Sequence, residues 1–229
     1  MRRIRIAILS SAGFLLAVHA ASARSGWYVA GSAGASWRLD ASRSTQFSNS
    51  FGMTGPGTNT TTYDPGPVVN LAVGYALPLG FRVEAELGYT HDAVASVSPS
   101  STDGMFPQLT GKRLALQSGG GHAGYSATIN AFYDLPVSGA FVPYIGAGFG
   151  VAHSDGEAAT FIGTGGTPRF SQSAGDATNA VVLAEFGVAI ALDAAWSIVP
   201  SYRFAHVLTP GSALANDASI LRIGLRYTF

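Results

Sequence analysis

From Gly26 onward, apolar and polar residues alternate with a period of two along most of the chain. In the last stretch, residues 219–229, Leu221, Ile223 and Leu225 share one parity, whereas Arg222 and Arg226 share the other. Successive residues of a β-strand point to opposite faces. A soluble β-protein would bury the apolar face, whereas a transmembrane barrel turns it toward lipid and keeps a polar interior.

Eight segments of this pattern are long enough to cross a membrane as tilted strands, which need about 9–11 residues each. Little of the remaining sequence has the 3.6-residue period of a helix. We therefore predict an all-β fold, an eight-stranded antiparallel up-and-down transmembrane β-barrel in which the last strand pairs with the first. The predicted strands are Gly26–Trp37, Pro67–Leu77, Phe81–Thr90, Ala123–Asp134, Phe141–Ala152, Ala180–Leu192, Ala195–His206 and Ser219–Phe229.

The connections alternate between short and long, which predicts the topology. The three short turns lie at residues 78–80, 135–140 and 193–194. The long connections are rich in Gly, Ser, Thr, Asn and Pro, and they are residues 38–66, 91–122, 153–179 and 207–218. Outer-membrane barrels have short periplasmic turns and long extracellular loops, so we expect both termini in the periplasm.

Some residues conflict with this pattern. Phe132, Val181 and Leu183 have the parity of the polar interior. Pro143 and Pro200 fall inside predicted strands, where a proline removes a ladder hydrogen bond. We expect Pro143 to lie at the rim or in a bulge, and Pro200 to mark a bulge.

Aromatic residues of the lipid-facing parity cluster at both ends of the predicted strands. Such belts of amphipathic rings are typical of the two membrane–water interfaces. The predicted periplasmic belt is Trp27, Phe81, Tyr133, Phe141, Trp196 and Phe229. The predicted outer belt is Trp37, Tyr89, Tyr125, Phe149 and Phe204.

Charged residues collect on the opposite, interior parity. An eight-stranded barrel is just wide enough for side chains to fill it, and unpaired charges inside would be costly. We therefore expect a lumen ion-pair network that plugs the barrel, and the alternative is a narrow gated ion path. The network residues are Arg82, Glu84, Glu86, Glu185, Arg203, Arg222 and Arg226, with Asn70, Asn130 and Asp134 as further polar partners.

Composition agrees with a secreted membrane protein. Charged residues make up 11 % of the chain, against about 25 % in typical soluble domains. Residues 1–23 read as a cleavable signal peptide, with Arg2, Arg3 and Arg5 before a short apolar run and Ala21-Ser22-Ala23 as the cleavage site. The barrel domain is then residues 24–229, with ten basic and thirteen acidic residues. We expect no nucleic-acid binding.

The remaining motifs favour neither a cofactor nor a catalytic centre. Gly146, Gly148 and Gly150 do not complete a nucleotide-binding motif before a helix, and we expect them to make room for interior arginines across the lumen. His153, Asp155 and Glu157 read as a solvated turn rather than a metal site. With no nucleophile–base–acid set visible, we predict no metal, no cofactor and no enzymatic activity.

Several segments resemble the small porin-like or opacity-type family of outer-membrane β-barrels, related in architecture to the OmpA transmembrane domain and OmpX. The segments that carry the resemblance are residues 74–75, 81–89, 130–135, 142–150, 200–204 and the C-terminal 225–229, which ends in an aromatic residue. The resemblance implies a surface antigen or adhesin-like protein of Gram-negative bacteria. It also implies that Tyr227 and Phe229 act as the signal for the barrel-assembly machinery, and that lipids and lipopolysaccharide surround the barrel.

The sequence leaves other functions open. We expect a monomer whose long loops meet an extracellular ligand, since loops on a rigid scaffold commonly carry recognition. The alternatives are a narrow channel for ions or small solutes, a lipid-directed outer-membrane hydrolase, and a lipocalin-like secreted binder. The last would place apolar residues inside, which the arginines of the final strand contradict.

Overall fold

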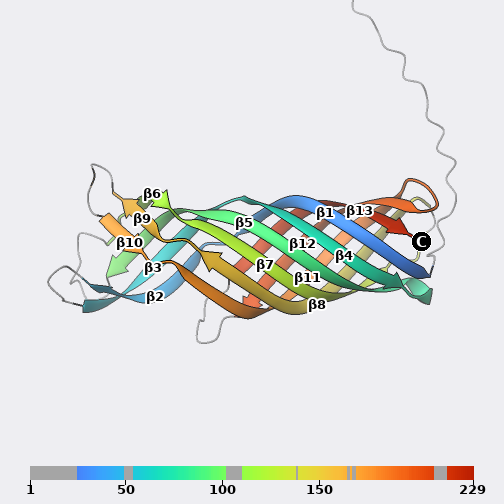
Figure 1. The fold of residues 1–229 in the computed structure, drawn as a ribbon, viewed down its shortest axis with the longest axis horizontal. Coiled ribbons are helices and arrows are strands. Elements are labelled where there is room, and N and C mark those ends of the chain that lie inside the picture. The colour runs from blue at the N-terminus through green and yellow to red at the C-terminus, as the bar shows by residue number, and fades with distance from the viewer. Residues whose placement is uncertain are drawn as a thin grey trace, which may run out of the picture.

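The computed structural model describes residues 25–48, 54–101, 110–137, 139–163, 166, 169–208 and 216–229. The predicted signal peptide lies outside these residues. Eight strands form a closed antiparallel ring, β1–β4–β5–β7–β8–β11–β12–β13, with β13 paired back to β1 (Figure 1). They are β1 (Gly26–Arg38), β4 (Gly66–Ala76), β5 (Phe81–Ser101), β7 (Gly121–Asp134), β8 (Phe141–Gly156), β11 (Gly175–Ala191), β12 (Trp196–Leu208) and β13 (Asn216–Thr228).

The first and last strands close the barrel, as the sequence predicts. Their register runs without interruption from Tyr28 opposite Thr228 to Arg38 opposite Ala218. At the end of this seam, Phe229 N donates a hydrogen bond of 3.0 Å to Trp27 O. Because closure leaves no free edge in the ring, every strand of the barrel has a partner on both sides.

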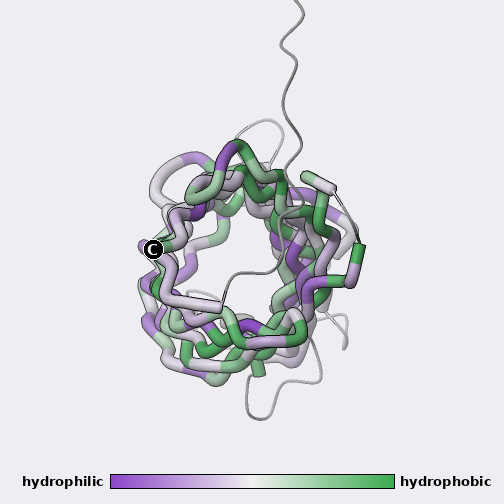
Figure 2. The backbone as a smooth tube through the Cα atoms, turned by 90° about the vertical axis from the view of Figure 1, so that its right-hand side faces the viewer, coloured by the Kyte–Doolittle hydropathy of each residue, from purple (hydrophilic) through white to green (hydrophobic). Residues whose placement is uncertain are grey.

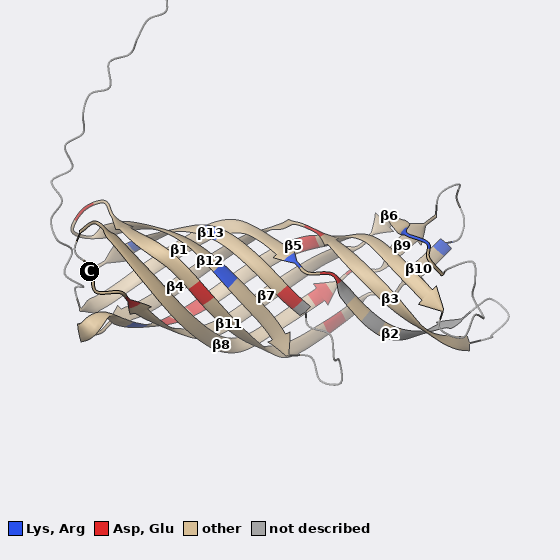
Figure 3. Ribbon diagram, turned by 180° about the vertical axis from the view of Figure 1, so that it is seen from behind, with Lys and Arg blue, Asp and Glu red and all other residues tan. Residues whose placement is uncertain are grey.

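The two faces of the barrel wall have opposite polarity. Outward residues are apolar and exposed, for example Leu71 at 72 % and Ile223 at 65 %, whereas Arg82 and Glu84 are each 5 % exposed. Figure 3 marks the few charged positions along the strands of the barrel, and Figure 2 views the ring from the end that carries the C terminus. The inside-out arrangement is therefore confirmed.

The long connections contain more structure than the sequence predicts. β5 runs on to Ser101, and five further strands pair beside it: β2 (Ala41–Ser48), β3 (Thr54–Asp64), β6 (Leu114–Gly119), β9 (Ala159–Ile162) and β10 (Arg169–Gln172). Their order is β2–β3–β5–β6–β9–β10, and we call this part the loop-end sheet. It projects from the end of the barrel opposite the C terminus (Figure 1).

The loop-end sheet has an apolar core of its own. Val97, Leu114 and Phe161 have no exposed surface, and Val94 and Ala159 pack with them. Tyr63, Leu116 and Phe170 cover the edge of this cluster. The sequence predicts only that these connections are long. Strands continue past the barrel here and bury apolar side chains on one face.

Both prolines lie in strands without a bulge at their positions. Pro143 pairs with Val188 in the unbroken register of β8 and β11, near the turn that follows β7. Pro200 pairs with Ile223 of β13, while the ladder to β11 is interrupted between the pairs at Ser201 and Ile198. The predicted bulge at Pro200 was wrong, because an interrupted ladder accommodates the missing N–H instead.

Tight turns join the strands at the end that carries the C terminus, which we call the turn end. A 3₁₀ turn, η1 (Pro78–Gly80), links β4 to β5, and Leu79 and Gly80 adopt positive φ values of 68° and 86°. None of the described residues forms a helix that is long and apolar enough to span a membrane.

The turn between β11 and β12 makes a pH-dependent prediction. Ala195 N and Trp196 N donate hydrogen bonds of 2.7 and 2.8 Å to Asp193 Oδ1, and these bonds lower the pKa of the Asp193 carboxyl. The turn should keep this support above the ordinary carboxyl range and lose it as the pH falls through the lowered pKa. NMR titration of the two amides should therefore show a midpoint below about 3.9. Asp193→Asn should abolish it, and a midpoint at or above the ordinary value would contradict the contact.

Candidate functional site

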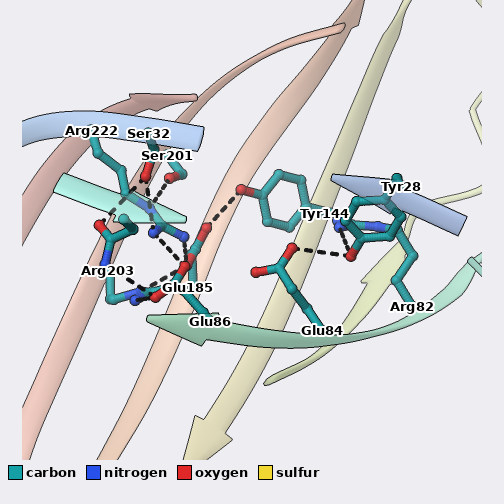
Figure 4. Close-up of polar contacts among 11 residues, drawn as sticks. Tyr28, Ser32, Arg82, Glu84, Glu86, Tyr144, Glu185, Ser201, Arg203 and Arg222 are labelled. Carbon is teal, nitrogen blue, oxygen red and sulfur yellow. Dashed lines mark hydrogen bonds and ion pairs between the residues drawn. The ribbon is translucent and has the colours of Figure 1, made fainter. Parts of the chain in front are cut away.

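Four charged side chains form a closed ring across the lumen, which we call the lumen ring. Its members are Glu86 of β5, Glu185 of β11, Arg203 of β12 and Arg222 of β13. Arg222 lies 2.8 Å from Glu86 and 2.6 Å from Glu185, and Arg203 lies 2.8 Å from Glu185 and also pairs with Glu86. Each carboxylate thus contacts both guanidinium groups, and the ring joins β5 to three strands that are not its neighbours (Figure 4).

Neutral groups complete the hydrogen bonds of the lumen ring. Tyr144 OH donates to Glu185 at 2.7 Å, and Asn70 Nδ2 donates to Glu86 at 3.3 Å. Arg222 Nε donates to Ser201 Oγ at 3.1 Å. All four ring residues are at most 7 % exposed. These ion pairs and hydrogen bonds are therefore needed to offset the hydration that the charged groups lose on burial.

A second charged layer lies toward the turn end. Arg82 binds the carboxylate of Asp134 through Nε and Nη2, each at 3.0 Å from Oδ1. Its guanidinium also lies over aromatic rings, 4.7 Å from the centroid of Phe132 and 4.9 Å from that of Tyr144. This contact accounts for the interior parity of Phe132, because an aromatic ring stabilises a desolvated arginine.

Glu84 and Arg226 lie in the lumen but differ from the prediction. Among the described residues, neither forms an ion pair within 4.0 Å. Glu84 instead accepts a hydrogen bond of 3.1 Å from Tyr28 OH, and the Arg226 guanidinium lies 5.6 Å from the centroid of the Tyr28 ring. Arg226 Nε and Nη1 are buried without a hydrogen-bond partner in the described part of the chain. The seven predicted residues therefore share the lumen without forming one network.

Little open space remains between the two charged layers. The cavity there has a volume of about 40 Å³, and its lining includes Ser32, Glu84, Tyr144 and Arg226. A cavity of this size has room for only a few water molecules. Side chains therefore nearly fill the middle of the barrel.

The predicted aromatic belts lie on the outer surface, where several rings pack in cross-strand pairs. Phe81 lies 4.9 Å from Tyr133, and Tyr89 lies 5.3 Å from Tyr125, between ring centroids. Phe149 pairs with Ile129 of β7, four positions along that strand from Tyr125. Its place in the outer belt is thus the weakest, and the role of both belts stays a prediction.

The glycines of β8 have a different role from the one that the sequence suggests. A Cβ at Gly146 would lie 2.2 Å from the Phe132 side chain, and one at Gly148 would lie 2.0 Å from Asn130 Oδ1. At Gly150 the obstacle is the backbone of Ala127, at 2.0 Å. These glycines make room for side chains and backbone of the adjacent strand β7, so the expectation that they make room for arginines across the lumen was wrong.

One arrangement of catalytic residue types was missed by sequence reasoning. His153 Nδ1 lies 2.7 Å from Thr178 Oγ1, and His153 Nε2 lies 3.0 Å from Asp155 Oδ1. Thr178 lies on another strand, 25 residues away from His153. The distance between these residues in the sequence therefore gave no indication of the contact. The His153 and Asp155 side chains are 41 % and 54 % exposed, and this exposure favours a solvated rim contact. No group of three or more potential metal ligands occurs among the described residues.

The comparisons with known proteins agree with this geometry. Residues 6–229 match the family model of the outer membrane protein beta-barrel domain. The chain belongs to this family. Family membership and the lipid-facing apolar surface place the barrel in the outer membrane. No curated protein sequence matches the chain.

Solved structures with this fold share little sequence with the chain. Neisserial surface protein A is 18 % identical, over 89 % of this chain and 97 % of that one, with a TM-score of 0.51. The outer membrane protease OmpT from Escherichia coli is 9 % identical over 94 % and 99 %, with a TM-score of 0.50. Ail of Yersinia pestis is 14 % identical over 90 % and 100 %, with a TM-score of 0.44. The likeness to the first two of these structures establishes the fold alone.

Proposed function

We propose that this family member is a surface-interaction barrel, an antigen or adhesin-like protein that presents the loop-end sheet outside the cell above a sealed lumen. The observation that carries the proposal is the separate apolar core of that sheet. Phe161, Leu114 and Val97 are fully buried there, although connections in a barrel that served only to span the membrane would need no packed core. A packed core holds a recognition surface in one shape.

The lumen ring supports the sealed state. Two buried carboxylates and two buried guanidinium groups neutralise one another across the passage. An ion that entered would have to displace these contacts in surroundings of low dielectric, where they are strong. The second candidate is a narrow channel. It is favoured by Glu84 and Arg226, which form no ion pair with other residues of the described segments and offer alternative partners to ring residues.

The remaining assignments follow from the same orientation. The loop end would face the medium, the turn end and both termini would face the periplasm, and lipid and lipopolysaccharide would surround the apolar wall. Tyr227 and Phe229 pack at the C-terminal seam, 5.2 Å apart between ring centroids, where the assembly machinery would meet β13. We expect a monomer without enzymatic activity.

A variant of the sheet core tests the proposed function. Phe161→Ala should destabilise the loop-end sheet locally by about 3–5 kcal/mol and leave the barrel folded. Cells that display this variant should adhere to an epithelial monolayer less than cells that display the wild type. They should also be cleaved faster by added protease, and only within the four long connections.

Two controls make this test decisive. Heat-modifiable gel mobility should be the same for both proteins, which would show that the barrel is intact. Phe141→Ala, at an exposed position near the turn end, should change neither adhesion nor cleavage. Wild-type adhesion no greater than that of cells without the protein would refute the adhesin function, and cleavage at the three short turns would refute the orientation.

A further inference from the structure

The lumen opens on the loop side of the ring into a large cavity, which we call the vestibule. Its volume is about 540 Å³, within the range of small-molecule sites. Arg203, Thr128 and Asn70 lie at its floor, and residues of the loop-end sheet line its upper part. The proposed surface interaction does not use this space.

The vestibule is long. On the continuous path of β3 and β4, lining residues extend from Asn59 to Asn70. Eleven residue steps at about 3.3 Å per residue correspond to roughly 36 Å along the tilted strand. A cavity of this length and volume fits an extended, unbranched molecule better than a compact one.

One wall above the ring is apolar. Val68, Leu183 and Ile220 point inward and are at most 7 % exposed, and Ala205 lies among them in the lining. Leu183 pairs with Ala205, which pairs with Ala218, two residues from Ile220. Leu183, Ala205 and Ile220 thus form a continuous strip over the neighbouring strands β11, β12 and β13, directly above the charges of the lumen ring, and Val68 lies beyond β1 on β4.

The rest of the lining is polar, but its charges are largely occupied. Arg38 lies 3.0 Å from Asp92, and its guanidinium also contacts both ring nitrogens of His122. By contrast, Asn59 Oδ1 in the upper part of the lining is buried and lacks a hydrogen-bond partner within the described residues, as does Thr128 Oγ1 at the floor. Asp92 Oδ1 also lacks a hydrogen bond there, but it lies 3.6 Å from His122 Nδ1. Unpartnered neutral oxygens next to paired charges favour a hydroxyl group over an ion.

We propose that the vestibule binds a single-chain amphiphile with an unbranched alkyl chain and a neutral hydroxylated head. The chain lies along the apolar strip above the lumen ring, and the head contacts the polar lining nearer the mouth. The intact ring closes the path below, so the molecule is held rather than passed through. This site is independent of the adhesive surface on the loop-end sheet.

Calorimetric titration of the protein in lipid nanodiscs with 1,2-alkanediols of six, eight and ten carbons tests the proposal, with empty nanodiscs as the reference for partition into lipid. Wild-type protein should bind more diol than the reference, and its affinity should rise about fourfold per added CH₂. Ala205→Phe fills the strip and should weaken binding at least about tenfold. Glycerol, which has the head without the chain, should not bind detectably.

Two further variants control for effects of the substitution that do not involve the vestibule and for loss of folding. Ala194→Phe, in the turn between β11 and β12, makes the same change away from the vestibule and should bind as the wild type does. Leu183→Asn keeps the side-chain size and should also weaken binding if Ala205→Phe fails to fold, as judged by heat-modifiable mobility. Heats equal to those of empty nanodiscs would overturn the proposal, and so would binding that persists in both strip variants.

Discussion

Glu86→Gln is expected to lower the free energy of unfolding by about 3–5 kcal/mol, because it leaves buried guanidinium charge uncompensated. Glu86 alone connects the lumen ring to β5, and both ring arginines bind it. Glutamine keeps the shape of the side chain, so the loss reports charge rather than packing. Urea unfolding in lipid vesicles, followed by tryptophan fluorescence, measures the change.

Glu84→Gln is the matched control for this prediction. Glu84 lies two residues from Glu86 on the same face of β5, but its hydrogen bond comes from the neutral Tyr28 hydroxyl. Glutamine can still accept that bond, so we expect a loss of only about 1 kcal/mol. Equal losses in the two variants would show that the closed ring has no special role.

The same two variants separate a sealed barrel from a channel. In planar lipid bilayers the wild type should pass no steady current, and Glu86→Gln should open one because the cross-lumen contacts of β5 are weakened. Glu84→Gln should remain closed. A wild-type current that neither variant changes would show that ions follow another path, and it would contradict the sealed lumen.

Gly34→Ala is expected to prevent or severely weaken closure of the barrel. Gly34 of β1 lies opposite Arg222 of β13, and a Cβ there would lie 2.1 Å from the Leu221 carbonyl oxygen and 2.7 Å from Arg222 Cα. Both obstacles are backbone atoms of the closing strand, which cannot move without opening the seam. We expect a loss at the upper end of the overpacking range, about 3 kcal/mol.

Gly224→Ala is the control at the same seam. It adds the same methyl group on the facing strand, but the nearest atom would be Ser32 Cβ at an acceptable 3.4 Å. Folded protein in outer-membrane fractions, measured by heat-modifiable mobility, should fall sharply for Gly34→Ala and hardly for Gly224→Ala. If both variants assemble normally, the seam is more compliant than the structure shows.

Most of what could be predicted from the sequence rests on strand parity, that is, on which residues of a strand point to the same face. The lipid-facing and lumen-facing sets follow from period-two alternation, because a slip of one residue would move every side chain to the wrong face. Short turns and the pairing of the first and last strands followed from the same pattern. Arg82, Glu86, Glu185, Arg203 and Arg222 share the interior parity, and all five are buried.

Partners within the lumen could not be predicted, since parity gives the face of a residue and not its depth. Glu84 and Glu86 have the same parity and chemistry, yet only Glu86 reaches the arginines of β12 and β13. Arg226 lies on the same face of β13 as Arg222, four residues further along. Its guanidinium lies next to the Tyr28 ring and away from the carboxylates of Glu86 and Glu185. The loop-end sheet was missed for two reasons. β6, β9 and β10, with 6, 4 and 4 residues, are too short to show periodicity. β2 and β3, with 8 and 11 residues, consist mostly of Ser, Thr, Gly and other polar residues and so show little apolar alternation.

The apolar core of the loop-end sheet divides the molecule into two parts that are stabilised by different forces. Polar contacts fill the barrel and lipid covers it, whereas the sheet depends on removing Val97, Leu114 and Phe161 from water. Cooling weakens the hydrophobic effect, on which the sheet depends, more than the polar contacts of the barrel. The two parts should therefore melt as separate transitions, and a single melting temperature would not describe this protein.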